Sequence, residues 1–327
     1  MMACLSGKVC VVTGASRGIG RGIALELVGN GAVCYITGRN AASLQLVDDE
    51  VKERGYPGRI IPVQCDHSKD EDVIDLFERV KSEQTGQLDL LVNNAYAAVE
   101  LLTNNQKTSF WDLDPVETWD TVNGVGLRNH YICSVYATRM MVPRRSGLII
   151  NIGSLGGLTY MTTPTYGIGK AAKDRMAKDC AIELKKFNIA FVALWPGAVK
   201  TEMMVAEMDK LVKNKVERYK TYEWILKNAE SSEYAGRCVV GLMKDPNIMK
   251  KSGQIALTTD LADEYNIKDV DGKCPNSMRS IRTMCAGGGA IGLANFLPGW
   301  LKLPTWLYKY LLSSFTAEQK KDPGKFA

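Results

Sequence analysis

Thr13-Gly14-Ala15-Ser16-Arg17-Gly18-Ile19-Gly20 stands between a short apolar run and a stretch with helical periodicity. The run before it, residues 9–12, is almost wholly apolar, which predicts a strand buried on both faces. Glycines at a turn from strand to helix let the backbone approach a pyrophosphate, and the helix N-terminus offers unpaired N–H groups there. We therefore predict that this segment binds a dinucleotide, the alternative being an ordinary structural turn.

The alternation of strand and helix continues along the chain. Apolar runs predict further strands at residues 33–37, 59–65, 88–92, 148–152, 189–194 and 252–257, and helical spacing predicts helices at 41–54 and 70–83. Such alternation produces a parallel sheet with right-handed crossovers. The expected fold is α/β: a doubly wound Rossmann-type parallel sheet of about seven strands flanked by helices, with an apolar C-terminal extension.

Composition limits the kinds of partner and site. The 327 residues carry a formal charge of +5 without a long basic block, so nucleic acid is not an expected partner. The nine cysteines include no C-x-x-C pair, which indicates reduced thiols in a cytosol-facing protein. With only two histidines, His67 and His130, we expect no metal site. The first residues lack the basic and apolar regions of a secretory signal, so none is expected.

Two arginines favour one form of the dinucleotide. Arg39 lies just past the second expected strand, where an acidic residue binds a ribose 2′-hydroxyl and a basic residue a 2′-phosphate. Neither Thr37 nor Gly38 is acidic, and Arg17 lies in the glycine-rich turn. The sequence therefore favours NADPH or NADP+ over NADH. The alternative for Arg39 is an ordinary solvated surface arginine.

Tyr166 and Lys170 form a candidate acid/base pair. In a helix, their spacing of four residues places phenol and ammonium on one face, and a nearby cation favours phenolate over phenol. Ser154 follows the expected strand 148–152, at the end of the sheet where catalytic groups are exposed. Ser154 is disfavoured as a nucleophile because no G-x-S-x-G elbow surrounds it and no histidine follows it. The Tyr–Lys spacing alone is also compatible with an ordinary surface pair.

Taken in order, these motifs resemble the classical short-chain dehydrogenase/reductase family over about residues 8–257. The resemblance implies that Ser154 binds the substrate carbonyl, that Tyr166 protonates the forming alkoxide, and that Lys170 assists Tyr166 and binds ribose hydroxyls. The implied function is NADPH-dependent reduction of ketones and aldehydes by hydride transfer, with steroids, lipid-derived carbonyls and xenobiotic carbonyls as apolar substrates. The alternatives are an NAD-linked alcohol dehydrogenase and a catalytically impaired nucleotide-binding sensor or scaffold.

The same resemblance assigns the cofactor-binding residues. Asp66 is expected at the adenine amino group, Asn93 near the adenosine ribose, and Thr201, after Pro196-Gly197, beside the nicotinamide. The full expected set is Gly14, Ser16, Arg17, Gly18, Ile19, Gly20, Arg39, Asp66, Asn93, Tyr166, Lys170 and Thr201.

The sequence departs from the family pattern at two positions. Tyr96 follows Asn93-Asn94-Ala95 where the family has glycine, which is expected to narrow or re-line the nicotinamide pocket. Gly126 stands where the family carries a catalytic asparagine that holds a water in the proton relay. We hypothesise that Asn123, one helical turn earlier, or a backbone-held water replaces this group. The alternative is that Asn123 is structural.

Two regions extend the fold after the expected sixth strand. Residues 201–235 resemble a mobile lid over the substrate. Its expected apolar pocket is formed by Met203, Met204, Met208, Tyr219 and Tyr222. The alternative is that these side chains are packed faces of helices. We divide the chain into a dehydrogenase/reductase domain, residues 1–257, and an extension, residues 258–327.

The extension carries a long apolar stretch. Residues 283–301 are 19 residues without a charge, enough for a membrane span, but their glycines and Pro298 break a helix. Aromatic residues next to Lys302 and Lys309 resemble interfacial anchors. We expect residues 283–312 to lie in a membrane surface. The alternatives are a tail that closes the substrate cleft or joins a dimer partner, and a true span. The expected location is the cytosolic face of the endoplasmic reticulum membrane, otherwise the cytoplasm, and homo-oligomers are a family-level expectation.

Overall fold

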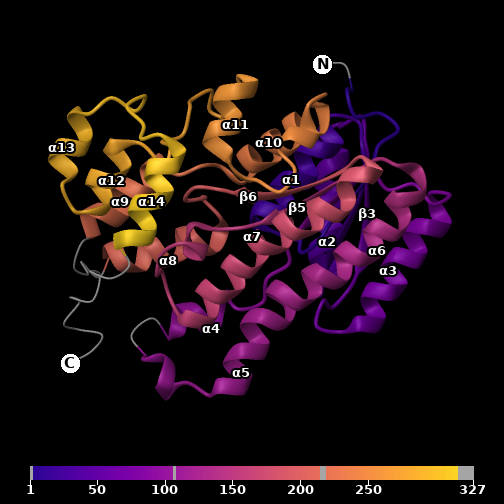
Figure 1. Ribbon diagram of the computed structural model, residues 1–327, viewed down its shortest axis with the longest axis horizontal. Coiled ribbons are helices and arrows are strands. Elements are labelled where there is room, and N and C mark those ends of the chain that lie inside the picture. The colour runs from indigo at the N-terminus through magenta and orange to yellow at the C-terminus, as the bar shows by residue number, and fades with distance from the viewer. Residues whose placement is uncertain (1–2, 106–107, 214–218, 316–327) are drawn as a thin grey trace.

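A seven-stranded parallel sheet forms the centre of the computed structural model, which describes residues 3–105, 108–213 and 219–315 (Figure 1). Its strand order is β3-β2-β1-β4-β5-β6-β7, and every neighbouring pair is parallel. The strands are β1 Val9–Val12, β2 Val33–Gly38, β3 Arg59–Gln64, β4 Leu90–Asn93, β5 Gly147–Ile152, β6 Ile189–Trp195 and β7 Ile255–Leu257. The predicted doubly wound α/β fold is confirmed.

Helices connect the strands and continue after the last of them. The α-helices are α1 Gly18–Gly29, α2 Ala41–Glu53, α3 Asp70–Glu83, α4 Val99–Asn104, α5 Pro115–Trp119, α6 Asn129–Arg144, α7 Pro164–Leu184, α8 Glu202–Lys213, α9 Tyr219–Asn228, α10 Ser232–Lys244, α11 Thr258–Tyr265, α12 Ile281–Gly287, α13 Ile291–Phe296 and α14 Thr305–Phe315. A π-helical segment, Asp120–Arg128, leads directly into α6. Short 3₁₀ turns cover Phe110–Asp112, Leu155–Gly157, Lys185–Phe187 and Ile248–Lys250.

Helices cover both faces of the sheet (Figure 1). In β1, Cys10 and Val12 pack in one cluster with α1, α2, α10 and α11, whereas Val9 and Val11 pack in a second cluster with α3, α6 and α7. Because both faces are buried, β1 is apolar along its whole length rather than alternating with polar residues. This burial is the reason that the strand could be predicted from the sequence.

The strand order reverses at β1, which pairs with β2 on one side and with β4 on the other. In a doubly wound sheet, such a reversal opens a crevice at the carboxyl ends of the strands, and ligands bind there. The glycine-rich turn leaves β1 at this edge, and the segments that follow β2, β3 and β4 meet it. The fold therefore gathers distant parts of the sequence around one crevice.

The last strand is shorter than the sequence predicts. It covers Ile255–Leu257 rather than residues 252–257. Gly253 has a φ of 77°, in the left-handed region that favours glycine, and the Ser252 hydroxyl accepts a hydrogen bond from the Phe191 N–H at 3.0 Å. The chain therefore turns before it enters the sheet. The other predicted strand and helix boundaries lie within two residues of the observed ones.

The extension packs against the second helix of the predicted lid, α9 (Figure 1). Trp224 of α9 is buried with Ala286 of α12 and Ala294 of α13. The Trp224 indole N–H also donates a hydrogen bond to Asn295 Oδ1 at 3.1 Å. The lid and the extension are therefore joined by apolar and polar contacts.

The uncharged run of the extension forms two short helices rather than one long helix. The break between α12 and α13 contains Gly289, whose φ is 88°. Within the described ranges, no helix is long and apolar enough to cross a membrane. Residues 214–218 of the predicted lid and 316–327 of the extension lie outside the described residues.

Candidate active site

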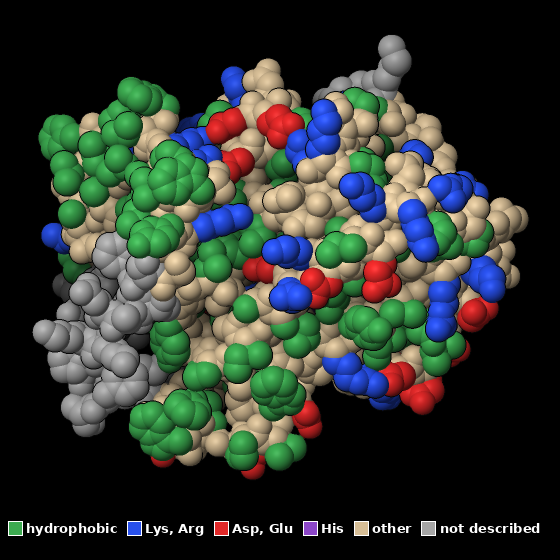
Figure 2. All heavy atoms as spheres, in the orientation of Figure 1, with side chains coloured by type: hydrophobic (Ala, Val, Ile, Leu, Met, Phe, Trp, Pro, Cys, Tyr) green, Lys and Arg blue, Asp and Glu red, His purple; other side chains and the backbone are tan. Residues whose placement is uncertain are grey.

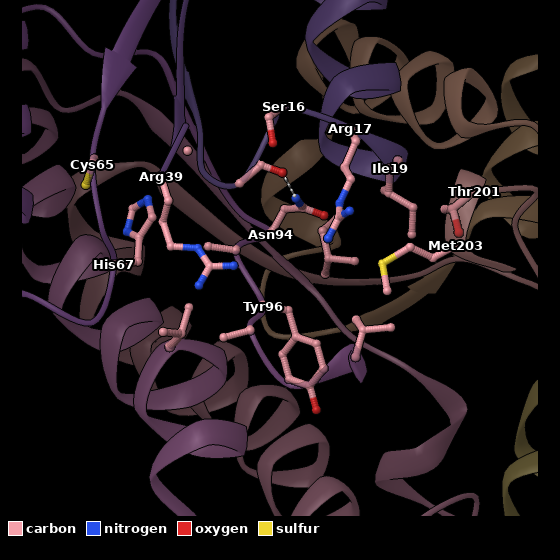
Figure 3. A pocket seen from close by; sticks show the side chains of 18 of the residues that line it. Ser16, Arg17, Ile19, Arg39, Cys65, His67, Asn94, Tyr96, Thr201 and Met203 are labelled. Carbon is pink, nitrogen blue, oxygen red and sulfur yellow. Dashed lines mark hydrogen bonds between the residues drawn. The ribbon is translucent and has the colours of Figure 1, made fainter. Parts of the chain in front are cut away.

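A cavity of about 410 Å³ opens at the carboxyl ends of the strands (Figure 3). Its wall includes most of the residues expected to bind the cofactor. These are Gly14, Ser16, Arg17, Gly18, Ile19, Arg39, Asp66, Lys170 and Thr201. The arrangement of the sheet therefore brings together residues that lie far apart in the sequence.

The glycine-rich turn forms the part of the wall next to α1. Gly14 and Gly18 have φ values of 64° and 57°, which favour glycine. A Cβ on Gly14 would lie 2.7 Å from the Ala95 Cα, so a side chain would not fit there. Gly20 does not line the cavity: a Cβ on it would lie 2.5 Å from the Gly14 carbonyl oxygen, so its role is close packing of α1 against the turn.

Two cationic side chains reach into the cavity, Arg17 from the turn and Arg39 from the end of β2 (Figure 3). The Arg39 carbonyl oxygen accepts a hydrogen bond from the Gln64 amide at 3.1 Å, which secures the segment after β2. Asp66 accepts hydrogen bonds from the backbone N–H and the hydroxyl of Ser68, at 3.0 and 2.8 Å. The N-terminus of α1 and two guanidinium groups make the cavity suited to a phosphorylated ligand.

The structure places the side chain of Asn93, which was expected near the adenosine ribose, away from the cavity. Its side chain is fully buried and donates hydrogen bonds to Ser134 Oγ and Asn151 Oδ1, both at 2.9 Å, so it does not line the cavity. Side chains alternate along a strand, and the next residue, Asn94, is the one in the wall. Its amide donates to the carbonyl oxygens of Thr13 and Gly14 at 2.9 Å.

Ser154 and Tyr166 meet beside the cavity. The Tyr166 hydroxyl donates a hydrogen bond to Ser154 Oγ at 2.9 Å, and the Gly156 N–H donates to the same oxygen at 3.2 Å. Thr163 caps the N-terminus of α7 by accepting from the Tyr166 N–H, which fixes the first turn of that helix. The local structure therefore holds together the two hydroxyl groups that the family resemblance assigns to one substrate oxygen.

Lys170 lies between two aromatic rings. Its Nζ is 5.4 Å from the centroid of the Tyr166 ring and 5.0 Å from that of the Tyr96 ring. The two rings are in edge-to-face contact, with centroids 6.3 Å apart. Cation–π attraction favours an ammonium group in this place. Tyr96 is therefore a neighbour of the predicted acid/base pair.

Tyr96 and Gly126, the two departures from the family pattern, form one structural feature. A Cβ on Gly126 would lie 2.7 Å from two atoms of the Tyr96 ring, so the ring fills the volume that a side chain at position 126 would need. The Tyr96 hydroxyl is buried and has no hydrogen-bond partner among the described residues. Burial raises the pKa of this phenol, so it stays protonated.

Asn123 lies against α7 rather than beside the Tyr166 hydroxyl. Its Nδ2 donates to the Thr165 carbonyl oxygen at 3.3 Å, and its Oδ1 packs against the Cα of Gly169. The buried Oδ1 has no hydrogen-bond partner in the described part of the chain. This placement favours the structural alternative for Asn123 over a role in place of the missing asparagine.

The predicted apolar substrate pocket overlaps the cavity wall in part. Met203 lines the cavity, whereas the other side chains of the predicted apolar pocket are half-buried on α8 and α9, outside its wall. These are Met204, Met208, Tyr219 and Tyr222. Met161, which the sequence did not single out, lies next to Ser154, with its sulfur 3.9 Å from Ser154 Oγ.

Two acidic residues that bind backbone N–H groups, one of them in the cavity wall, were missed by the sequence analysis. Glu202, at the start of α8, accepts a hydrogen bond from the Gly18 N–H at 3.1 Å. Glu230 accepts from the Gly197 N–H at 2.9 Å, and burial raises its pKa to about 7. Both contacts join residues that are far apart in the sequence, so no local sequence pattern predicts them.

The fold and this site together define a class of protein. A glycine-rich turn at the switch point of a parallel sheet binds dinucleotides. The paired hydroxyl groups of Ser154 and Tyr166, with Lys170 beside them, suit proton transfer to and from an oxygen atom. These features define a nicotinamide-dependent oxidoreductase.

Comparison with known proteins agrees with this class. The family model described as short chain dehydrogenase matches residues 8–212. The chain is 46% identical to Dehydrogenase/reductase SDR family member 1 of Mus musculus and 45% identical to that of Homo sapiens, over 96% of this chain and 100% of each relative. A solved structure of a 3-oxoacyl-[acyl-carrier protein] reductase with bound NAD from Brucella melitensis has a TM-score of 0.64 and 26% identity, covering 78% of this chain and 91% of that one. The chain therefore belongs to the short-chain dehydrogenase/reductase family, as its motifs predict.

Proposed function

We propose that the protein reduces ketone and aldehyde carbonyls of apolar substrates with NADPH. The observation that carries this proposal is the 2.9 Å contact between the Tyr166 and Ser154 hydroxyl groups, next to Lys170 in the cavity wall. Two hydroxyl groups beside a cation are arranged to bind and protonate an oxygen atom on which negative charge develops. The reverse reaction, alcohol oxidation, uses the same groups.

Ser154 is arranged to donate its own proton to a substrate. Its oxygen already accepts hydrogen bonds from Tyr166 and Gly156, so its hydrogen is left for another acceptor and points to Met161 Sδ at 3.9 Å. A thioether sulfur is a weak acceptor, so a substrate carbonyl oxygen displaces it readily. Tyr166 gives its proton to that oxygen as the alkoxide forms, and the charge of Lys170 stabilises the phenolate left behind.

The cavity fits a nicotinamide cofactor, which supplies the hydride when bound. The N-terminus of α1 suits the pyrophosphate, and Arg17 and Arg39 offer two cations for a 2′-phosphate. These charges support NADPH.

The bound NAD of the Brucella reductase favours a second candidate, an NAD-linked alcohol dehydrogenase. We expect Arg39→Asp to lower the preference for NADPH over NADH at least about tenfold, and a wild-type protein that prefers NADH would support the second candidate.

Steroids, lipid-derived ketones and xenobiotic carbonyls are the proposed substrate class. Support comes from Met161 beside Ser154 and from Met203 in the cavity wall, because methionine side chains adapt to varied apolar shapes.

The test of the proposed function is loss of NADPH fluorescence, with NADH in parallel, on a panel of steroid and aromatic ketones. Tyr166→Phe is the matched control, since it removes only the hydroxyl that donates the proton. Turnover that disappears in the control supports the reductase. Tight NADPH binding without turnover on any ketone would favour a nucleotide-binding sensor, with Gly126 as the first position to examine.

We propose in addition that the extension attaches to the cytosolic face of the endoplasmic reticulum membrane. Hydrophobic side chains gather over α12, α13 and α14 (Figure 2). Phe296 is 90% exposed, Trp300 77% and Trp306 71%. Exposed aromatic groups of this kind insert at membrane interfaces.

A vesicle-binding experiment tests this attachment. The protein is expected to cosediment with phosphatidylcholine and phosphatidylserine vesicles. This cosedimentation should be lost in a Phe296→Ser, Trp300→Ser, Trp306→Ser variant and kept in a Phe110→Ser, Trp111→Ser control.

A further inference from the structure

Lys173 is a buried amine next to the candidate acid/base pair, and the mechanism proposed above does not use it. It lies on α7, three residues after Lys170, so both side chains project from one side of the helix. Only 2% of its surface is exposed, whereas lysine is almost never fully buried without a partner. A hydrophobic residue would cost far less at this position, so its presence points to a role for the amine.

Lys173 connects Lys170 to the strand that carries Ser154. Its Nζ donates a hydrogen bond to the carbonyl oxygen of Ile152 at 2.8 Å, and Ile152 is the last residue of β5, two positions before Ser154. The amine also lies beside that of Lys170, close enough for the two to interact by charge and by hydrogen bonding. Lys173 therefore stands between Lys170 and the end of the strand.

The surroundings of Lys173 favour an uncharged amine. Burial and then the charge of Lys170 hold the pKa of Lys173 well below its ordinary value. Asp174 opposes this shift, but burial raises its own pKa to about 6. From α6, burial above all holds the pKa of His130 well below its ordinary value. An uncharged amine can donate a hydrogen bond to Ile152 and still offer its lone pair to an ammonium group.

We propose that Lys173 is a positioning residue whose amine accepts a hydrogen bond from Lys170 and donates one to Ile152, fixing Lys170 relative to Ser154. The proposal rests on the proposed function, because Lys173 acts through Lys170.

Two substitutions separate this role from simple packing. Lys173→Met keeps the length of the side chain and removes the amine. Lys173→Gln keeps a donor and an acceptor and is uncharged at every pH. Lys178→Met, on an exposed position of the same helix, is the matched control. Thermal unfolding of each variant establishes that it is folded.

We expect Lys173→Met to lower kcat at least about tenfold, because the placement of Lys170 beside Tyr166 is lost. Lys173→Gln is expected to retain at least about a third of kcat, and Lys178→Met all of it. A Lys173→Met variant with wild-type kcat, or a Lys173→Gln variant as impaired as Lys173→Met, overturns the proposal.

The pH profile gives a readout that a packing role would not move. Protonation of Lys173 places two ammonium groups side by side, so wild-type kcat is expected to fall toward acid pH. The titratable groups that face this amine are Lys170 and Asp174 on α7 and His130 on α6. Lys173→Gln keeps all of these groups, so it should lose the part of the fall in kcat at acid pH that comes from protonation of Lys173. The same fall in kcat at acid pH in Lys173→Gln as in the wild type overturns the proposal.

A last measurement is independent of turnover. Nuclear magnetic resonance of protein labelled with ¹³C at the lysine Cε is expected to show one lysine that titrates well below the others and disappears in Lys173→Met. An ordinary titration of all lysines overturns the proposal. If no carbonyl is reduced by the wild-type protein, the proposed function fails, and this titration still decides the state of Lys173.

Discussion

The substitution Gly126→Asn introduces the asparagine of the family pattern, yet we expect it to lower kcat/KM about tenfold or more. A Cβ at Gly126 would lie 2.7 Å from the Tyr96 ring, and displacing that ring removes the aromatic face 5.0 Å from Lys170 Nζ. Overpacking of this kind costs about 1–3 kcal/mol. The double variant Tyr96→Gly, Gly126→Asn removes the clash and is expected to be more active than Gly126→Asn alone.

A double-mutant cycle in kcat/KM and in thermal stability measures this coupling. Gly124→Asn is the matched control in the same π-helical segment, because no heavy atom lies within 4 Å of a Cβ at Gly124. If the effects of the two single substitutions simply add, Tyr96 and Gly126 do not depend on one another.

Glu230 is expected to make the protein less stable as the pH rises toward neutrality. Burial raises the pKa of its carboxyl from 4.5 to about 7. Between these values, the folded protein keeps a proton that the unfolded chain has released, so the free energy of unfolding falls as the pH rises through this window. Below pH 4.5 the effect is absent, and above pH 7 it reaches its full size of up to about 3 kcal/mol.

Glu230→Gln imitates the protonated carboxyl and should flatten this dependence. The measurement is urea unfolding at pH 5 and pH 8, with the exposed Glu223→Gln as control. Burial lowers the pKa of His67 to about 4. This residue therefore makes the free energy of unfolding rise with pH below neutrality, and it does so equally in all variants. An identical pH dependence in wild type and Glu230→Gln would contradict the role of Glu230.

At the scale of elements, the start of α8 competes with a ligand for the start of α1. The Glu202 carboxylate accepts from the Gly18 N–H at 3.1 Å, and that N–H belongs to the helix N-terminus expected to bind a pyrophosphate. A negative charge there repels phosphate. We therefore expect Glu202→Gln to tighten NADPH binding about threefold to tenfold. This estimate takes the interaction of a charge with a helix terminus to be worth about 1 kcal/mol.

Fluorescence titration with NADPH measures this affinity, and Glu207→Gln on the same helix is the control for a general loss of negative charge. Unchanged or weaker binding in Glu202→Gln would mean that the carboxylate does not occupy the phosphate position.

The sequence predicts the elements well because their signals are local. Strands such as β1 are buried on both faces and appear as apolar runs, and the glycine-rich turn needs the φ values that only glycine adopts readily. The sequence does not show in which direction one side chain points. Asn93 and Asn94 are adjacent and chemically identical, and only the structure shows that Asn94 faces the cavity.

Most of the missed parts of the site depend on contacts across long stretches of chain. Gly18 and Glu202 are 184 residues apart, and Gly197 and Glu230 are 33 residues apart. Lys173 follows Lys170 closely, but an exposed lysine on the same helix has the same sequence signal. Burial, which separates the two, is a property of the folded protein.

At the scale of the whole molecule, Trp224 is one of the residues that join the lid to the extension. It is buried with Ala286 and Ala294, its indole binds Asn295 at 3.1 Å, and the Arg282 guanidinium lies 5.7 Å from its ring centroid. Removing a buried tryptophan costs about 3–5 kcal/mol. Because this cluster lies apart from the two sheet clusters, we expect Trp224→Ala to loosen the lid and the extension without unfolding the sheet.

Hydrogen exchange tests this expectation region by region. In Trp224→Ala, amides of α9, α12 and α13 should exchange faster, while those of β1 and β4 keep their wild-type rates. If the lid closes over the substrate, the KM for a bulky ketone should rise while that for NADPH stays constant, because α9 contributes no residue to the cavity wall. Trp300→Ala, at a position 77% exposed, is the matched control. Faster exchange throughout the sheet would mean that the extension supports the whole domain, and unchanged exchange in α12 and α13 would mean that Trp224 does not hold them.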